Sequence, residues 1–83
     1  AIAAAWEQAR EAGLAPDSEE VQQIAARHAA WIRVGWQGGE VSPEALRGLA
    51  EMYVADERFA ANYGGVEGSQ YVRDGLVAYA HRL

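Results

Sequence analysis

The sequence contains no cysteine, no lysine and no threonine, and it has only two prolines, one methionine and one phenylalanine. Without a thiol, the 83-residue chain can form neither a disulfide framework nor a thiolate zinc site. Its two histidines, His28 and His81, are too few for a structural metal cage without several carboxylates. No apolar run approaches the roughly 18 residues that a membrane-spanning helix requires. We therefore expect a cytoplasmic domain with no membrane partner, no metal and no cofactor.

Positive charge is also scarce. Seven arginines face twelve Asp and Glu residues, which gives a net charge of −5 and an isoelectric point near 4.8. Because negative charge repels phosphate backbones, we expect this segment to contact DNA only through a separate region of a longer protein. The hydrophobic content of 51% is typical of a folded globule, and the length fits one small domain over residues 1–83.

Hydrophobic spacing predicts helices almost throughout, because apolar residues recur at i, i+3, i+4 and i+7 and no segment alternates with a period of two. Glycine, proline and capping residues divide the pattern into short elements. The fold class is therefore all-α, a compact bundle of about five short helices. We expect these helices to run from Ile2 to Gly13, from Asp17 (a capping box with Glu20) to about Trp36, from Ser42, from Asp56 to Tyr63, and from about Ser69 to Arg82.

Eight aromatic side chains are many for so small a core. They fill volume, line a ligand cleft, or do both, because aromatic walls suit large, flat ligands. His28 lies on the most regular apolar stripe and would supply a polar anchor. The candidate ligand-binding residues on inward helical faces are His28, Trp31, Trp36, Met52, Tyr53 and Tyr79.

No pattern supports catalysis. Neighbouring Asp56 and Glu57 would point about 100° apart on a helix, so they do not form an acid–base pair. All three serines (Ser18, Ser42 and Ser69) fall at expected helix starts, where capping explains them. His28 is either a core or pocket-lining histidine with one nitrogen hydrogen-bonded, or a haem or catalytic residue on a globin-like helix face. We expect no enzymatic activity.

Two arginines are candidates for fixing helices relative to one another. Arg58 follows two acids, and Arg73 precedes Asp74. Either guanidinium could form a forked pair with a carboxylate on another helix.

A series of motifs over roughly residues 17–80 resembles the TipAS family, the antibiotic-recognition domain attached to MerR-type transcription activators. The most specific part is an eleven-residue string from Leu49 to Phe59. The motifs are Leu-Ala-Glu-Met-Tyr-Val-Ala-Asp-Glu-Arg-Phe, preceded by His28-x-x-Trp31-Ile32 and Ser42-Pro43-Glu44, and followed by Tyr63, Gly68 and Tyr71-Val72-Arg73-Asp74.

The resemblance implies a globin-related all-α fold and capture of bulky, apolar antibiotics such as thiopeptides between helices. It also implies an N-terminal winged-helix DNA-binding region and a dimerising coiled coil, through which antibiotic binding would raise transcription. This chain would then be the C-terminal part of a longer regulator, which could form a homodimer. The founding member traps dehydroalanine-containing thiopeptides with a cysteine just before the Leu-x-Glu-Met-Tyr string. Here Gly48 occupies that place, so we expect reversible binding. Gly75 departs from the common Arg-Asp-Ala ending and should cost about 0.5–1 kcal/mol of helix stability.

We therefore expect a drug-sensing effector domain. The alternatives are a helical interaction or dimerisation module without a small-molecule ligand, and a haem-binding protein that uses His28.

Overall fold

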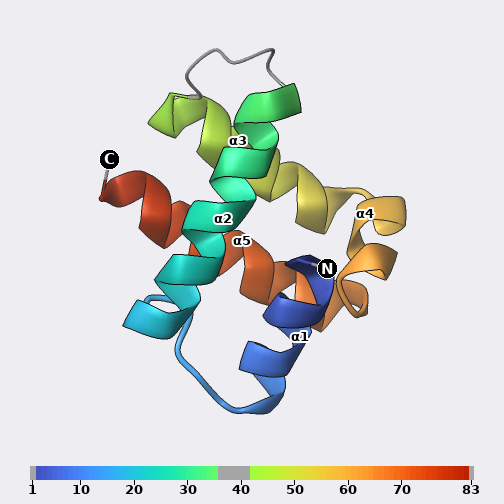
Figure 1. Cartoon of the computed structure of the whole chain (residues 1–83). Helices are drawn as coiled ribbons and strands as arrows, with labels where there is room; N and C mark the ends of the chain where they lie inside the picture. Colours follow the sequence, from blue (N-terminus) through green and yellow to red (C-terminus); the bar gives the residue numbers. More distant parts are fainter. Residues whose placement is uncertain (1, 36–41, 83) are drawn as a thin grey trace.

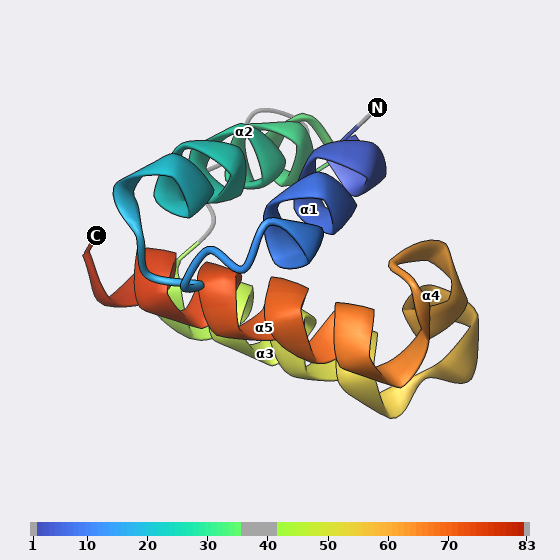
Figure 2. The ribbon, with the colours of Figure 1, turned by 90° about the horizontal axis from the view of Figure 1, so that it is seen from below.

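The chain folds into helices stacked in two layers (Figures 1 and 2). The computed structural model describes residues 2–35 and 42–82, which contain no strand. The predicted all-α bundle of five short helices is confirmed. None of the helices in these ranges has the length and hydrophobicity needed to cross a membrane. One layer holds α1 (Ile2–Glu11) and α2 (Glu19–Gly35), the other holds α3 (Pro43–Ala55) and α5 (Gly65–His81), and the short α4 (Glu57–Asn62) closes one end.

Two of the predicted helix starts are confirmed. The Ser42 hydroxyl accepts a hydrogen bond from the backbone N–H of Ala45 at 3.1 Å, and Pro43 is the first residue of α3. Asp56 ends α3 and begins α4, where its carboxylate accepts from the backbone N–H of Arg58 at 2.9 Å. These caps satisfy amide groups that the first helical turn leaves unpaired.

The cap of α2 lies one residue beyond the predicted one. The helix begins at Glu19, and the side chain that accepts from its first turn is Ser18, whose hydroxyl lies 3.4 Å from the backbone nitrogen of Val21. Asp17 is exposed and precedes the helix. Aspartate and serine are equally good caps, so sequence preference could not choose between the two neighbours.

The prediction that α5 begins near Ser69 is wrong. The helix begins at Gly65, because Gly64 and Gly65 adopt φ values of +89° and +86° that let the chain turn directly into the helix. Ser69 is fully buried within α5, and its hydroxyl donates to the carbonyl oxygen of Val66 at 2.9 Å. It is therefore not a cap.

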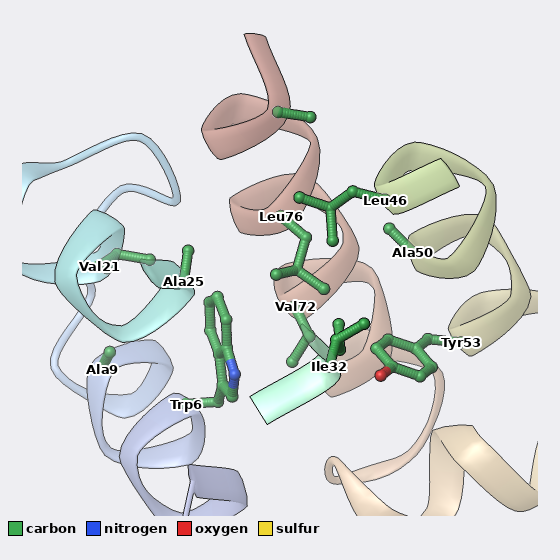
Figure 3. Close-up of a cluster of buried hydrophobic side chains, with 11 residues drawn as sticks. Trp6, Ala9, Val21, Ala25, Ile32, Leu46, Ala50, Tyr53, Val72 and Leu76 are labelled. Carbon is green, nitrogen blue, oxygen red and sulfur yellow. The ribbon is translucent and has the colours of Figure 1, made fainter. Parts of the chain in front are cut away.

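The hydrophobic core lies between the two layers (Figure 3). Trp6 enters it from α1 and is only 2% exposed. Alanines on α1, α2 and α3 allow the helices to approach closely around the larger side chains. The buried apolar residues are Trp6, Ala9, Val21, Ala25, Ile32, Leu46, Ala50, Tyr53, Ala60, Val72, Leu76 and Ala80.

Two polar side chains also tie the two layers together by hydrogen bonds. The Gln22 amide nitrogen on α2 donates to the carbonyl oxygen of Pro16 at 3.0 Å and to that of Gly75 on α5 at 3.1 Å. The Tyr71 hydroxyl on α5 donates to the carbonyl oxygen of Leu14 at 2.8 Å. The connector between α1 and α2 is thereby held against α5.

Gly75 is required by packing, although glycine weakens a helix. A Cβ atom built there would lie 2.7 Å from two ring carbons of Trp6. We expect Gly75→Ala to lower the free energy of unfolding by about 1–3 kcal/mol, because the overpacked indole must shift. Helix propensity alone predicts a gain of about 1 kcal/mol. Urea denaturation distinguishes the two, and a variant more stable than the wild type would contradict the packing argument.

One of the two candidate arginines links helices. Arg73 on α5 lies 3.7 Å from the Glu51 carboxylate on α3 and 2.8 Å from Asp74. Arg58 pairs at 3.2 Å with Asp56, the residue that caps the start of its own helix, so of the two candidates it is Arg73 that pairs across helices. The hydrogen bonds from Arg58 hold the pKa of the Asp56 carboxyl below its ordinary value. Arg58 is exposed, so this pair contributes little to stability.

Candidate functional site

A buried histidine joins three helices. His28 on α2 is 0% exposed. The indole Nε1–H of Trp6 on α1 donates to its Nδ1 at 2.9 Å, and its Nε2 lies 3.0 Å from the Tyr53 hydroxyl on α3. The second of these hydrogen bonds joins two of the predicted site residues, His28 and Tyr53. The expectation of one hydrogen-bonded nitrogen is wrong, because both ring nitrogens are engaged.

These contacts fix the protonation of His28. An indole N–H can only donate, so Nδ1 must carry a lone pair, and the neutral ring then bears its proton on Nε2. Burial lowers the pKa of His28 from 6.5 to about 4, so the ring is neutral at pH 7. An iron ligand at either nitrogen would have to displace one of these hydrogen bonds.

Further rings surround this centre. Tyr53 packs against Phe59 on α4, with ring centroids 5.4 Å apart, and against Tyr63 at 5.3 Å. Tyr63 also lies 5.9 Å from the His28 ring. We call these residues, together with the tryptophans that contact His28, the aromatic cluster: Trp6, His28, Trp31, Tyr53, Phe59 and Tyr63.

Trp31 is the member of the aromatic cluster that reaches the protein surface. Its ring meets His28 edge-on, with centroids 6.1 Å apart and planes at 89°. The side chain is nevertheless 64% exposed, so the expectation that it faces inward is wrong. Ala25 and Ile32 define the centre of the buried face of α2, and Trp31 lies to one side of it. The exposed indole therefore extends the apolar surface of the cluster into solvent.

Met52 also points away from the core. It is 47% exposed, whereas its neighbour Tyr53 is 3% exposed. Successive residues on a helix are separated by about 100°, so with Tyr53 pointing into the core its neighbour Met52 lies at the margin of the buried face. The buried face of α3 is completed by Ala50, a small residue between Leu46 and Tyr53. The expectation that Met52 faces inward is therefore wrong.

The other two predicted residues lie apart from the centre or outside the described ranges. Tyr79 is partly buried on α5 and packs against the hydrophobic core. Trp36 is outside the described residues. The predicted site omitted Trp6, Phe59 and Tyr63. A signal for Trp6 was available, because a buried indole N–H needs an acceptor and His28 offers one.

The aromatic cluster has a hydrogen-bonded polar centre and an apolar rim. Its buried polar atoms are satisfied by one another, and its rim consists of the partly exposed rings of Phe59 and Tyr63 and the exposed ring of Trp31. Within residues 2–35 and 42–82, no three His, Asp or Glu side chains gather as metal ligands. Stacking on such rings binds flat apolar molecules without demanding one polar pattern.

Comparison with known proteins places the chain in a family. The TipAS antibiotic-recognition domain matches residues 1–79. The HTH-type transcriptional regulator SkgA of Caulobacter vibrioides, from two strains, is 34% identical over 70 residues, which cover 82% of this chain. The match covers only 27% of those relatives. No solved structure matches significantly. The domain match and the five-helix fold together show that the chain belongs to the TipAS antibiotic-recognition domain family.

Proposed function

We propose that this chain is the effector domain of a MerR-type transcription regulator and that it reversibly binds bulky, largely apolar antibiotics of the thiopeptide type. Membership of the TipAS family supports an effector role. The observation that most supports a binding site here is the exposed Trp31 ring, which packs edge-on against the buried, hydrogen-bonded His28. Because His28 is held rigidly by its hydrogen bonds, the indole packed against it loses less conformational entropy when a ligand binds.

The ligand is held without a covalent bond or a reaction. The chain has no cysteine, and Gly48 stands on the exposed surface of α3. The acid–base groups at the centre of the aromatic cluster are neutral and already paired, so we propose that the domain is not an enzyme. Signalling to DNA, and any dimerisation, would use parts of a longer cytoplasmic protein.

Binding should stabilise the domain. At a ligand concentration 100 times the Kd, the gain is about 2.7 kcal/mol, which raises the Tm of a domain of this size by about 10 °C or more. Thermal melts with a panel of thiopeptides measure this shift. Dialysis should return the Tm to its starting value, and mass spectrometry should show the unmodified chain. A panel without any effect would overturn the proposal.

Trp31→Ala should weaken binding selectively. We expect the thiopeptide Kd to rise at least about tenfold, because an aromatic anchor is lost. The free energy of unfolding should change by less than about 0.5 kcal/mol, because the side chain is mainly in solvent. Titration calorimetry measures the Kd, with Gln23→Ala, an exposed position on the same helix, as the matched control. Equal affinity of both variants would remove Trp31 from the site.

The exposed Trp31 also suits the second candidate, a helical interaction module. That function predicts self-association at micromolar concentration, which Trp31→Ala would abolish. Sedimentation velocity that shows a stable monomer able to bind a thiopeptide would exclude it.

A further inference from the structure

One hydrogen bond joins α1 to the centre of the aromatic cluster. The indole Nε1–H of Trp6 donates to Nδ1 of His28 at 2.9 Å, and both side chains are buried. An indole nitrogen can only donate, so this bond exists only while Nδ1 is unprotonated. The other ring nitrogen, Nε2, bears the hydrogen of the neutral ring and donates it to the Tyr53 hydroxyl on α3 at 3.0 Å. The two bonds of His28 therefore depend differently on its charge.

Protonation of His28 breaks only the bond to α1. Both nitrogens of an imidazolium are donors, so Nδ1–H would face the indole N–H of Trp6 at the same 2.9 Å separation of the two nitrogens. The bond from Nε2–H to the Tyr53 oxygen keeps its direction and becomes charge-assisted. The added proton thus separates α1 from α2 and leaves α2 joined to α3.

The rings that pack against His28 do not supply a negative charge to hold the imidazolium in place. Among the described residues, the titratable ones are Tyr53 on α3 and Tyr63 after α4. Burial is the main cause that raises the pKa of both hydroxyls, so both are neutral in acid. A proton on His28 therefore meets two neutral hydroxyls and one opposing indole donor.

The charged residues of the adjoining helices do not offset this repulsion. Arg10 on α1 and Arg27 on α2 are cations, like the imidazolium itself. Asp56 at the end of α3 and Arg73 on α5 are already paired with other side chains. Within residues 2–35 and 42–82, no carboxylate forms an ion pair with His28.

Release of α1 costs less than unfolding of the whole domain. The helix buries Trp6 and Ala9 against α2 and α5, whereas complete unfolding also separates α3 from α5 (Figure 2). Either process exposes His28, so the same proton favours both, and the less costly one is populated first. The released segment ends before Leu14, because the Tyr71 hydroxyl on α5 holds the carbonyl oxygen of that residue at 2.8 Å.

We propose that the Trp6–His28–Tyr53 arrangement is a pH switch, in which protonation of His28 releases Ile2–Glu11 from the domain while α2, α3 and α5 stay packed together. The pKa of His28 is about 4 in the closed form and returns towards 6.5 on exposure, so release is favoured as the pH falls below 6.5. Relative to pH 7, the equilibrium constant for release should rise by about tenfold at pH 5.5 and about 100-fold at pH 4.

Hydrogen exchange of the wild-type domain, followed by NMR at pH 7, 5.5 and 4, measures this constant directly. Protection factors correct for the intrinsic pH dependence of exchange. Those of the α1 amides should be lower than those of α3 and α5, and they should fall by about tenfold at pH 5.5. Protection that is equal in α1, α3 and α5, or an α1 value that does not change with pH, would overturn the inference.

A matched pair of variants assigns the effect to His28. Asparagine places its side-chain oxygen near the position of Nδ1, so His28→Asn keeps an acceptor for Trp6 and cannot be protonated. Its α1 protection should change by less than about twofold between pH 7 and 5.5. His81→Asn removes the exposed histidine of α5 and should keep the wild-type fall. A tenfold fall in His28→Asn would overturn the inference, and the wild-type measurement decides it if that variant does not fold.

Discussion

Gly68→Ala is expected to leave the domain largely unfolded at 25 °C. A Cβ atom at this position would overlap the Tyr63 carbonyl oxygen and lie 2.6 Å from the Tyr63 carbonyl carbon. Both are backbone atoms, so no rotamer change relieves the clash, and the turn between α4 and α5 would have to open. We expect a loss of more than about 4 kcal/mol. A domain this small has only roughly 3–5 kcal/mol to lose.

Gly48→Ala is the matched control. Gly48 also lies within a helix, but a Cβ atom there meets nothing within 4 Å. This variant should gain about 0.5–1 kcal/mol, because alanine favours the helix. Circular dichroism melts of the two variants and the wild type measure the contrast. If Gly68→Ala melted at the wild-type temperature, the close packing of the turn against α5 would be wrong.

The stability of the domain should fall steeply in mild acid. His28 has a pKa near 6.5 in the unfolded chain and about 4 in the folded protein. Between these values the unfolded state binds a proton that the folded state does not, so protonation favours unfolding. The contribution is fully present above pH 6.5 and is lost as the pH falls towards 4, by about 3 kcal/mol in total. Protonation would also place two donors, the Trp6 indole and Nδ1–H, against each other.

Urea denaturation at several pH values between 7 and 4 measures this loss. His28→Gln has no group at this position that titrates in the range, and it can still replace one of the two hydrogen bonds. We expect the variant to be less stable at pH 7 but to have a flatter profile. All other ionisable groups are common to the two proteins, so the difference between the profiles isolates His28. Parallel profiles would show that His28 is not held neutral.

Local sequence signals predicted the helices well. Ser42, Pro43 and Asp56 act within one turn of their own position, so their capping roles follow from residue type alone. The start of α5 was missed because Ser69 has the same local signature as a cap. What distinguishes it is burial in the packed fold, which the neighbouring residues do not reveal.

The site was harder to predict, because its members come from four helices and a turn. Periodicity placed His28 and Tyr53 inward but did not separate the centre of a face from its margin, where Trp31 lies. From the sequence, Gly75 was expected only to weaken its helix. The packing that requires glycine there comes from the indole of Trp6, 69 residues earlier in the chain, which helix propensity does not reveal. Contacts between residues far apart in the sequence, rather than helix propensity, determine which residue type these positions require.

The central claim is that the rim of the aromatic cluster captures foreign molecules reversibly, and NMR titration of the isotope-labelled domain with a thiopeptide tests it most directly. We predict shifts at the Trp31 indole N–H and at the rings of Phe59 and Tyr63, which return to their starting positions after dialysis. Saturable shifts confined to other parts of the domain, or no shifts at all, would contradict the account.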